Sequence, residues 1–200
     1  MFFNIFNKKK NSKHSDKKGD KNSHLKERVN RKKKEQIANR KGEIGEYKID
    51  IQLSQFPKEY RYLTDIMVKN PKSGTGYSQI DHILITPYGI FVIETKNYQG
   101  TIYGGKNRKE WNVNGKFKVM NPVYQNYGHI KVLQSLLDRK FSDHFISIVS
   151  FTKRCKFKVE LDLRKVQSNE LIVYDVELTE FINRKVNVNR LQNNKEPLLS

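Results

Sequence analysis

The order of apolar and polar residues predicts a helix followed by three strands at the start of the folded region. Apolar residues recur at near-helical spacing from Ile44, and Pro57 ends that helix. Three segments rich in Tyr, Ile and Val then predict strands, over 60–69, 77–86 and 90–96. The last of these contains the unbroken apolar run Ile90-Phe91-Val92-Ile93, which is typical of a strand covered on both faces.

The remaining sequence predicts further strands and two more helices. Four glycines between residues 100 and 115 mark a hairpin region that holds Trp111. Asn121-Pro122 begins a helix, because proline suits a first helical turn. The later predicted elements are a helix, two strands and a closing helix, over 121–137, 145–151, 171–174 and 176–186. This order predicts an α/β fold in which helices flank a mixed sheet.

Positive charge is concentrated in the first 41 residues. The 200-residue chain holds 39 Lys and Arg against 21 Asp and Glu, a formal net charge of +18. Residues 1–41 contain 15 of the basic residues and 4 of the acids, and so carry +11 of that charge. Their few apolar residues cannot bury enough surface to fold alone, although 25–40 has the pattern of a basic helix. We therefore expect residues 1–41 to form a basic tail, largely disordered or helical.

Three interpretations of this tail remain open. In the first, the tail is a solvated linker. In the second, it contacts nucleic acid without sequence preference, and in the third, it attaches to an anionic membrane surface. Membrane attachment would use the apolar side chains near the N-terminus as a shallow wedge, namely Phe2, Phe3, Ile5 and Phe6.

Cysteine content and hydropathy argue against secreted and membrane-spanning proteins. The single cysteine, Cys155, rules out an internal disulfide framework and a cysteine-based zinc site, and fits a reducing compartment. No apolar run approaches the roughly 20 residues that span a bilayer. We expect a cytoplasmic protein, which would be peripheral to the membrane if the membrane interpretation of the tail holds.

Two acids and a lysine interrupt apolar strands and are the candidate catalytic residues. Asp81 lies inside one strand, and Glu94 and Lys96 share a face at the end of the next. A hairpin centred between residues 87 and 88 would place Asp81 opposite Glu94, so that two carboxylates converge. Two hard oxygen ligands suit Mg²⁺, and Lys96 would hold the attacking water or stabilise charge on a phosphate. A salt bridge that serves only the fold is the alternative.

Six short motifs surround these residues in order. They are GEIGE (42–46), QIDHILI (79–85), YGIFVIETKN (88–97), GTIYG (100–104), Trp111, and NPVYQN (121–126) with His129. Together they resemble the nuclease-related domain (NERD), a bacterial branch of the PD-(D/E)xK nuclease-like superfamily.

The resemblance implies a restriction-endonuclease-like αβββαβ core and a divalent metal, Mg²⁺ or Mn²⁺. Asp81, Glu94 and Lys96 match the catalytic motif, with the two acids as metal ligands. Glu46 matches an acid on the first helix that supports the metal shell.

The same resemblance extends to the helix after Pro122 and to the domain boundaries. Gln125 is similar to polar residues that lie beside the metal or the DNA backbone, and His129 shares its helix face. Residues 42–152 would form the nuclease-like domain, and 153–200 would add a strand and a helix to it.

The predicted function is metal-dependent hydrolysis of phosphodiester bonds, with nucleic acid, and DNA in particular, as the partner. The alternative is a non-catalytic module that binds nucleic acid or a membrane surface. Trp111, Tyr103 and Phe117 are candidates for stacking on unpaired bases, but packing within the core or hairpin is the preferred interpretation. His82 is interpreted as a satisfied structural histidine.

Overall fold

The computed structural model describes residues 17–193 and 197–198 and has the predicted mixed α/β architecture, with helices flanking mixed sheets. Its contacts divide the chain into two compact units, with the boundary between Arg40 and Lys41. The helices are α1 (Lys17–Leu53), α2 (Pro122–Leu136) and α3 (Leu178–Asn193). The strands are β1 (Arg61–Lys69), β2 (Tyr77–Thr86), β3 (Gly89–Lys96), β4 (Gly100–Tyr103), β5 (Glu110–Val113), β6 (Phe117–Met120), β7 (Phe145–Phe151), β8 (Cys155–Lys158) and β9 (Glu170–Tyr174).

Helix α1 begins earlier than the apolar pattern predicts. The predicted first helix is its C-terminal part, and the same helix includes the basic segment back to Lys17. Residues 28–33 and 35–40 are exposed, as expected where apolar residues are few. Residues 1–16, with the proposed apolar wedge, lie outside the described residues. In the part of the chain that the structure describes, no helix is both long and apolar enough to cross a membrane.

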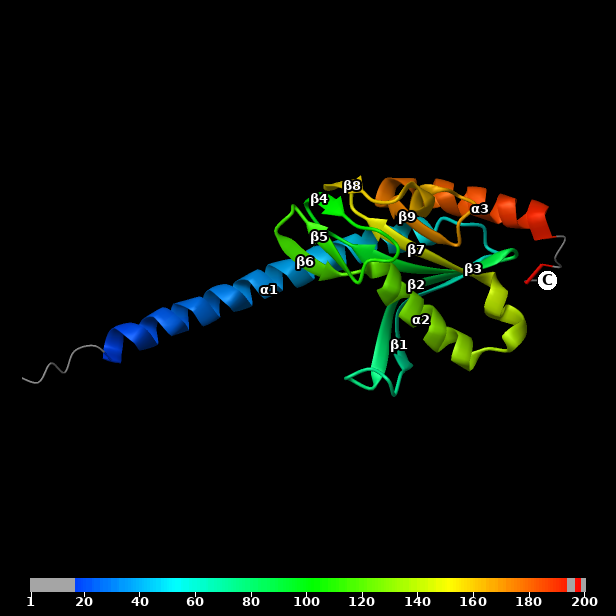
Figure 1. Cartoon of the computed structure of the whole chain (residues 1–200). Helices are drawn as coiled ribbons and strands as arrows, with labels where there is room; N and C mark the ends of the chain where they lie inside the picture. The colour runs from blue at the N-terminus through cyan, green and yellow to red at the C-terminus, as the bar shows by residue number, and fades with distance from the viewer. Residues whose placement is uncertain (1–16, 194–196, 199–200) are drawn as a thin grey trace, which may run out of the picture. The chain divides into compact units, whose positions relative to one another are not determined.

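The main sheet has the strand order β1-β2-β3-β7-β9 (Figure 1). The first three strands are antiparallel, whereas β3, β7 and β9 run parallel. The β2–β3 register runs from His82 opposite Ile93 to Thr86 opposite Gly89, and it is centred between residues 87 and 88 as predicted. The carboxyl ends of β3 and β7 therefore lie side by side.

Helices cover both faces of this sheet, with α2 and α3 on opposite sides (Figure 1). On one face, α1 and α3 pack on strand residues that include Phe91 and Ile93. On the other face, α2 packs on strand residues that include Ile90 and Val92. Successive strand residues point to opposite faces. Glu94 and Lys96 therefore point toward α2.

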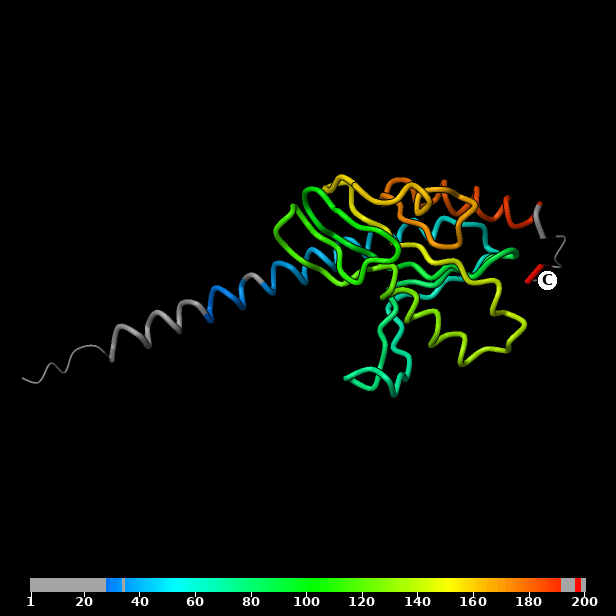
Figure 2. Tube along the Cα trace, in the orientation of Figure 1, coloured from blue at the N-terminus to red at the C-terminus, as the bar shows by residue number. Residues whose placement is uncertain are grey.

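A second sheet, ordered β6-β5-β4-β8, forms where the glycine pattern predicts only a hairpin region (Figure 1). Figure 2 shows the path of this part of the chain in green, beside the yellow segment that contains β8. Strand β8 pairs in parallel with β4 and has no counterpart in the sequence prediction. Trp111 is buried, and its ring stacks on Phe151 of the main sheet at 6.3 Å between centroids. Packing is therefore confirmed for Trp111, whereas Tyr103 and Phe117 are exposed.

The closing helix also differs from its predicted bounds. Residues 175–177 form a 3₁₀ turn, so α3 begins at Leu178 and continues to Asn193. Glu177 caps the 3₁₀ turn, because its carboxylate accepts a hydrogen bond from the Tyr174 backbone N–H at 3.0 Å. Arg164 holds the same carboxylate in place at 2.8 Å.

Candidate nuclease site

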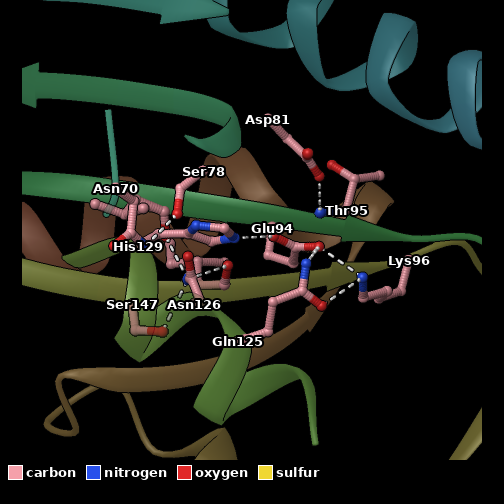
Figure 3. A network of polar contacts seen from close by, with 12 residues as sticks. Asn70, Ser78, Asp81, Glu94, Thr95, Lys96, Gln125, Asn126, His129 and Ser147 are labelled. Atoms are coloured by element: carbon pink, nitrogen blue, oxygen red, sulfur yellow. Dashed lines mark hydrogen bonds and ion pairs between the residues drawn. The ribbon is translucent and has the colours of Figure 1, made fainter. Parts of the chain in front are cut away.

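Glu94, Lys96 and Gln125 form a closed triangle of hydrogen bonds between the end of β3 and α2. The Lys96 ammonium donates to Glu94 Oε1 at 2.6 Å and to Gln125 Oε1 at 3.0 Å. Gln125 Nε2 donates to Glu94 Oε1 at 2.7 Å. Figure 3 shows these three side chains pointing toward one another. The helix face predicted for Gln125 thus lies against the candidate acid and lysine.

His129 lies on the other side of the Glu94 carboxylate. Its Nε2 is 3.2 Å from Glu94 Oε2, one helical turn after Gln125. Both side chains are nearly inaccessible to solvent, with side-chain exposures of 11% for His129 and 3% for Glu94. Sequence reasoning gave His129 little weight, although its spacing of four residues from Gln125 was the available signal.

Helix α2 is fixed in this position by two buried asparagines. Asn126 Nδ2 donates to Val92 O at 2.8 Å and to Ser147 Oγ at 2.9 Å, which joins the helix to β3 and β7. Asn121 caps the helix by accepting the Val123 N–H at 2.9 Å. Both asparagines belong to the motif at 121–126. We infer that they serve to position Gln125 and are not themselves reactive.

Asp81 lies where β2 parts from β3. The last paired residues of the two strands are His82 and Ile93, so Asp81 stands one step beyond the ladder. Its Oδ2 accepts the backbone N–H of Thr95 at 2.8 Å (Figure 3). Across the β1–β2 pair, Asp65 has a left-handed backbone with φ of 50°, which interrupts the regular strand at this level.

Glu46 approaches the same region from α1. The preceding residue, Gly45, is buried, and a Cβ there would lie 3.2 Å from the Thr95 methyl group. A side chain at position 45 would therefore hold the helix away from the end of β3. Glu46 itself is half-buried. Its pKa is raised first by burial and then by the charges of Asp65 and Glu94.

The pKa values of the two strand acids, Asp81 and Glu94, are shifted in opposite directions. Burial, followed by the Glu94 charge, raises the pKa of Asp81 to about 7, against the pull of the Thr95 N–H. Burial works in the same direction on Glu94, but the contacts from His129 and Lys96 outweigh it and hold the Glu94 pKa below its usual value. At neutral pH, Glu94 is a carboxylate and Asp81 is divided between its acid and carboxylate forms.

Lys96 remains an ammonium. Its burial acts to lower the pKa, but the Glu94 carboxylate outweighs burial and raises the pKa above its usual value. The lysine therefore acts as a positively charged hydrogen-bond donor at neutral pH, and it does not act as a base.

Asp81 and Glu94 are the residues best suited to hold a metal, because both present carboxylate oxygens at the end of the sheet. Within the described residues, no three acidic, histidine or cysteine side chains already lie together as a metal cluster. Glu46 influences the strand acids electrostatically but does not form such a cluster with them.

His82 differs from its predicted role as a satisfied structural histidine. It is buried, yet neither ring nitrogen has a hydrogen-bond partner among the described residues. Burial lowers the pKa of His82 to about 4, so the ring is neutral at physiological pH.

Together, the mixed sheet and the acid–lysine arrangement at the end of β3 define a nuclease-like module. Residues 41–152 match the family profile of the nuclease-related domain, NERD, over more than half of the chain, and the chain belongs to this family. The resemblance inferred from the six motifs is thus confirmed.

Among curated proteins, an uncharacterised protein of Bacillus anthracis is 36% identical over 129 residues. The match covers 62% of this chain and 59% of that protein, so the chain spans less than two thirds of this relative. No solved structure shows a significant match.

Proposed function

We propose that the chain hydrolyses phosphodiester bonds of DNA with Mg²⁺ or Mn²⁺, and that Asp81 and Glu94 bind the metal. The observation that carries this proposal is the poor compensation of Asp81. The Asp81 carboxyl is partly buried and accepts a backbone hydrogen bond, and its pKa is raised to about 7. The Lys96 charge lowers the pKa of Asp81 less than burial and the Glu94 and Glu46 charges raise it, and a divalent cation would add the missing stabilisation of the carboxylate.

The donor set fits the proposed ion. Mg²⁺ prefers carboxylate oxygens, takes few protein ligands and retains waters and phosphate oxygens in its shell. Asp81 and Glu94 would hold it, with Glu46 supporting the shell from α1. When bound, such an ion polarises a phosphate and lowers the pKa of a coordinated water.

The other residues of the site act by position and charge. Lys96 stays protonated and would donate a hydrogen bond to a phosphate oxygen or to the attacking water. Gln125 contacts both Glu94 and Lys96, so it would fix the positions of the carboxylate and the ammonium relative to each other. His129 would keep Glu94 ionised from the opposite side.

A cleavage assay tests this function. Purified protein is incubated with labelled single- and double-stranded DNA, and with RNA of the same sequence, in Mg²⁺, Mn²⁺ or EDTA. We expect DNA cleavage with the divalent ions, no cleavage in EDTA, and loss of cleavage in Asp81→Asn.

Asp162→Asn is the matched control, because Asp162 is exposed and pairs only locally with Lys165 at 2.7 Å. Its activity should equal that of the wild type. Absence of cleavage of every substrate with either ion would overturn the proposal, and binding without cleavage would identify the chain as a nucleic-acid-binding module.

A further inference from the structure

The second sheet carries a groove that the candidate nuclease site does not use. The groove has a volume of about 860 Å³ and lies over β4, β5 and β6 next to the start of α2. Its lining is mostly aromatic and basic. Such a lining suits a ligand that has flat apolar surfaces together with negative charge.

Two tyrosines supply exposed rings in this groove. Tyr103 of β4 is 36% exposed and Tyr124 of α2 is 43% exposed, and Met120 adds an exposed apolar side chain between the elements. Neither ring is needed to fill the hydrophobic core, because the core cluster of this sheet is built from other residues. Both rings are therefore available to stack against a ligand.

Positive charge surrounds these rings. Arg108, Lys109 and Lys118 line the groove, whereas Glu110 is its one lining acid among the described residues and pairs with Lys118 at 3.1 Å. Lys158 adds a further cation, with Nζ 5.4 Å from the centre of the Tyr103 ring. Cations beside exposed aromatic rings match the alternation of phosphates and bases in an unpaired strand.

The floor of the groove is rigid. Trp111 is almost fully buried, and its Nε1 donates to Gly105 O at 3.0 Å. Asn121 Nδ2 donates to Arg108 O at 2.7 Å, which joins the start of α2 to the loop between β4 and β5. Tyr124 and Arg108 are therefore held on elements that are tied to each other.

The groove and the candidate site share helix α2. Tyr124 lines the groove, and the next residue, Gln125, contacts Glu94 and Lys96. The first turn of α2 therefore contributes a residue to the groove and a residue to the candidate site.

We propose that this groove binds single-stranded DNA, with Tyr103 and Tyr124 stacking on bases and Arg108, Lys109 and Lys118 contacting phosphates. The inference deepens the proposed nuclease function by naming an unpaired strand as the preferred substrate. Duplex DNA keeps its bases stacked on one another and cannot offer them to the two rings.

Binding is measured without chemistry, on the full chain in EDTA. A labelled oligothymidylate of about 12 nucleotides and a duplex of the same length are titrated by fluorescence anisotropy. Tyr103→Ala and Tyr124→Ala should each weaken single-strand binding by roughly 5- to 150-fold, the range expected for one lost base–aromatic stack. Duplex binding should change by less than twofold.

Two controls separate stacking in the groove from loss of the tyrosine hydroxyl and from loss of an exposed tyrosine elsewhere. Tyr124→Phe keeps the ring and should bind like the wild type, whereas Tyr77→Ala removes an equally accessible tyrosine, 51% exposed, from β2 and should have no effect. Because the chain has one tryptophan, binding should also change the intrinsic fluorescence of Trp111 at the groove floor.

The outcomes distinguish this inference from the nuclease function. If both alanine variants bind single-stranded DNA within twofold of the wild type, the proposal that the groove binds single-stranded DNA is overturned, even if DNA cleavage is observed. If both variants lose affinity for single-stranded DNA but not for duplex DNA, the proposed role of the groove is supported, even if no metal produces cleavage. Equal weakening of duplex and single-strand binding would also contradict it, because stacking would then not be the cause.

Discussion

Replacing Asp81 by asparagine should stabilise the metal-free fold at alkaline pH while removing activity. Asparagine keeps an oxygen that can accept the Thr95 N–H, which Asp81 accepts at 2.8 Å, but it carries no charge. The buried charge, and not the hydrogen bond, is therefore the quantity that this substitution changes.

The raised pKa of Asp81 determines the sign and the magnitude of the expected change in folding stability with pH. A pKa of about 7 in the folded state, against 3.8 without the perturbation, means that the folded protein binds this proton more tightly than the unfolded chain. Stability is therefore lost as the pH rises from about 4 to about 7, by about 4 kcal/mol in total. More than half of this loss falls between about pH 5 and about pH 8.

Urea denaturation of wild type and Asp81→Asn at these two pH values, in EDTA, measures the effect. The difference in unfolding free energy between variant and wild type should increase by about 2–3 kcal/mol from the lower to the higher pH. Saturating Mg²⁺ should then stabilise the wild type by about 2.7 kcal/mol at 100 times its dissociation constant, and the variant much less. If the difference in unfolding free energy between Asp81→Asn and the wild type does not depend on pH, Asp81 does not carry a partly buried, poorly compensated charge.

Three further perturbations test other parts of the structure. Lys96→Gln should slow DNA cleavage by about 100-fold or more while leaving Mg²⁺ affinity by calorimetry unreduced, because the ammonium is not a ligand; loss of Mg²⁺ binding would contradict that role. Deletion of residues 1–40 should retain cleavage at low salt and flatten the plot of log K against log salt by about 0.9 per lost phosphate contact. If the slope stays the same, the tail does not contact DNA, and binding to anionic vesicles is the next assay. Gly104→Ala should cost about 1–3 kcal/mol in urea denaturation, since a Cβ would overlap the Trp111 ring; Gly74→Ala, which meets no atom within 4 Å, should be neutral, and equal effects would exclude this packing argument.

Local patterns were sufficient to predict the strands of the main sheet and the pairing of β2 with β3. Strand β2 has its predicted bounds, 77–86, and β7 has its predicted bounds, 145–151. The reason is physical: the turn at Pro87-Tyr88-Gly89 leaves little freedom to the register of the β2–β3 hairpin, which could therefore be derived by counting residues. The alternation of strand residues then predicts that Glu94 and Lys96 share a face.

Features that depend on distant segments could not be predicted in this way. Strand β8 has four residues and exists because β4, more than 50 residues earlier, offers it an edge. The start of α1 at Lys17 has no apolar periodicity to indicate it. His129 could be assigned to a helix face, but its contact with Glu94 depends on the buried asparagines that fix α2 on the sheet.

The position of Asp81 shows both the power and the limit of sequence reasoning. Counting from the hairpin predicts that Asp81 lies opposite Glu94, and the observed register, extended by one residue, has the same centre. The pairing nevertheless ends at His82, at the level where the neighbouring strand β1 has the left-handed backbone of Asp65. Beyond this point Asp81 accepts the Thr95 N–H, and burial together with the Glu94 charge raises its pKa, which no local pattern indicates.

Single-turnover cleavage of labelled DNA by the wild type and by Glu94→Gln tests the central claim most directly. With saturating Mg²⁺ we expect cleavage by the wild type, none in EDTA, and a rate lower by roughly 10³-fold or more for Glu94→Gln. Glu180→Gln, which removes an exposed acid paired with Arg184 on α3, should cleave at the wild-type rate. Equal cleavage by Glu94→Gln and the wild type, or cleavage that persists in EDTA, would contradict a metal-dependent nuclease built on Glu94.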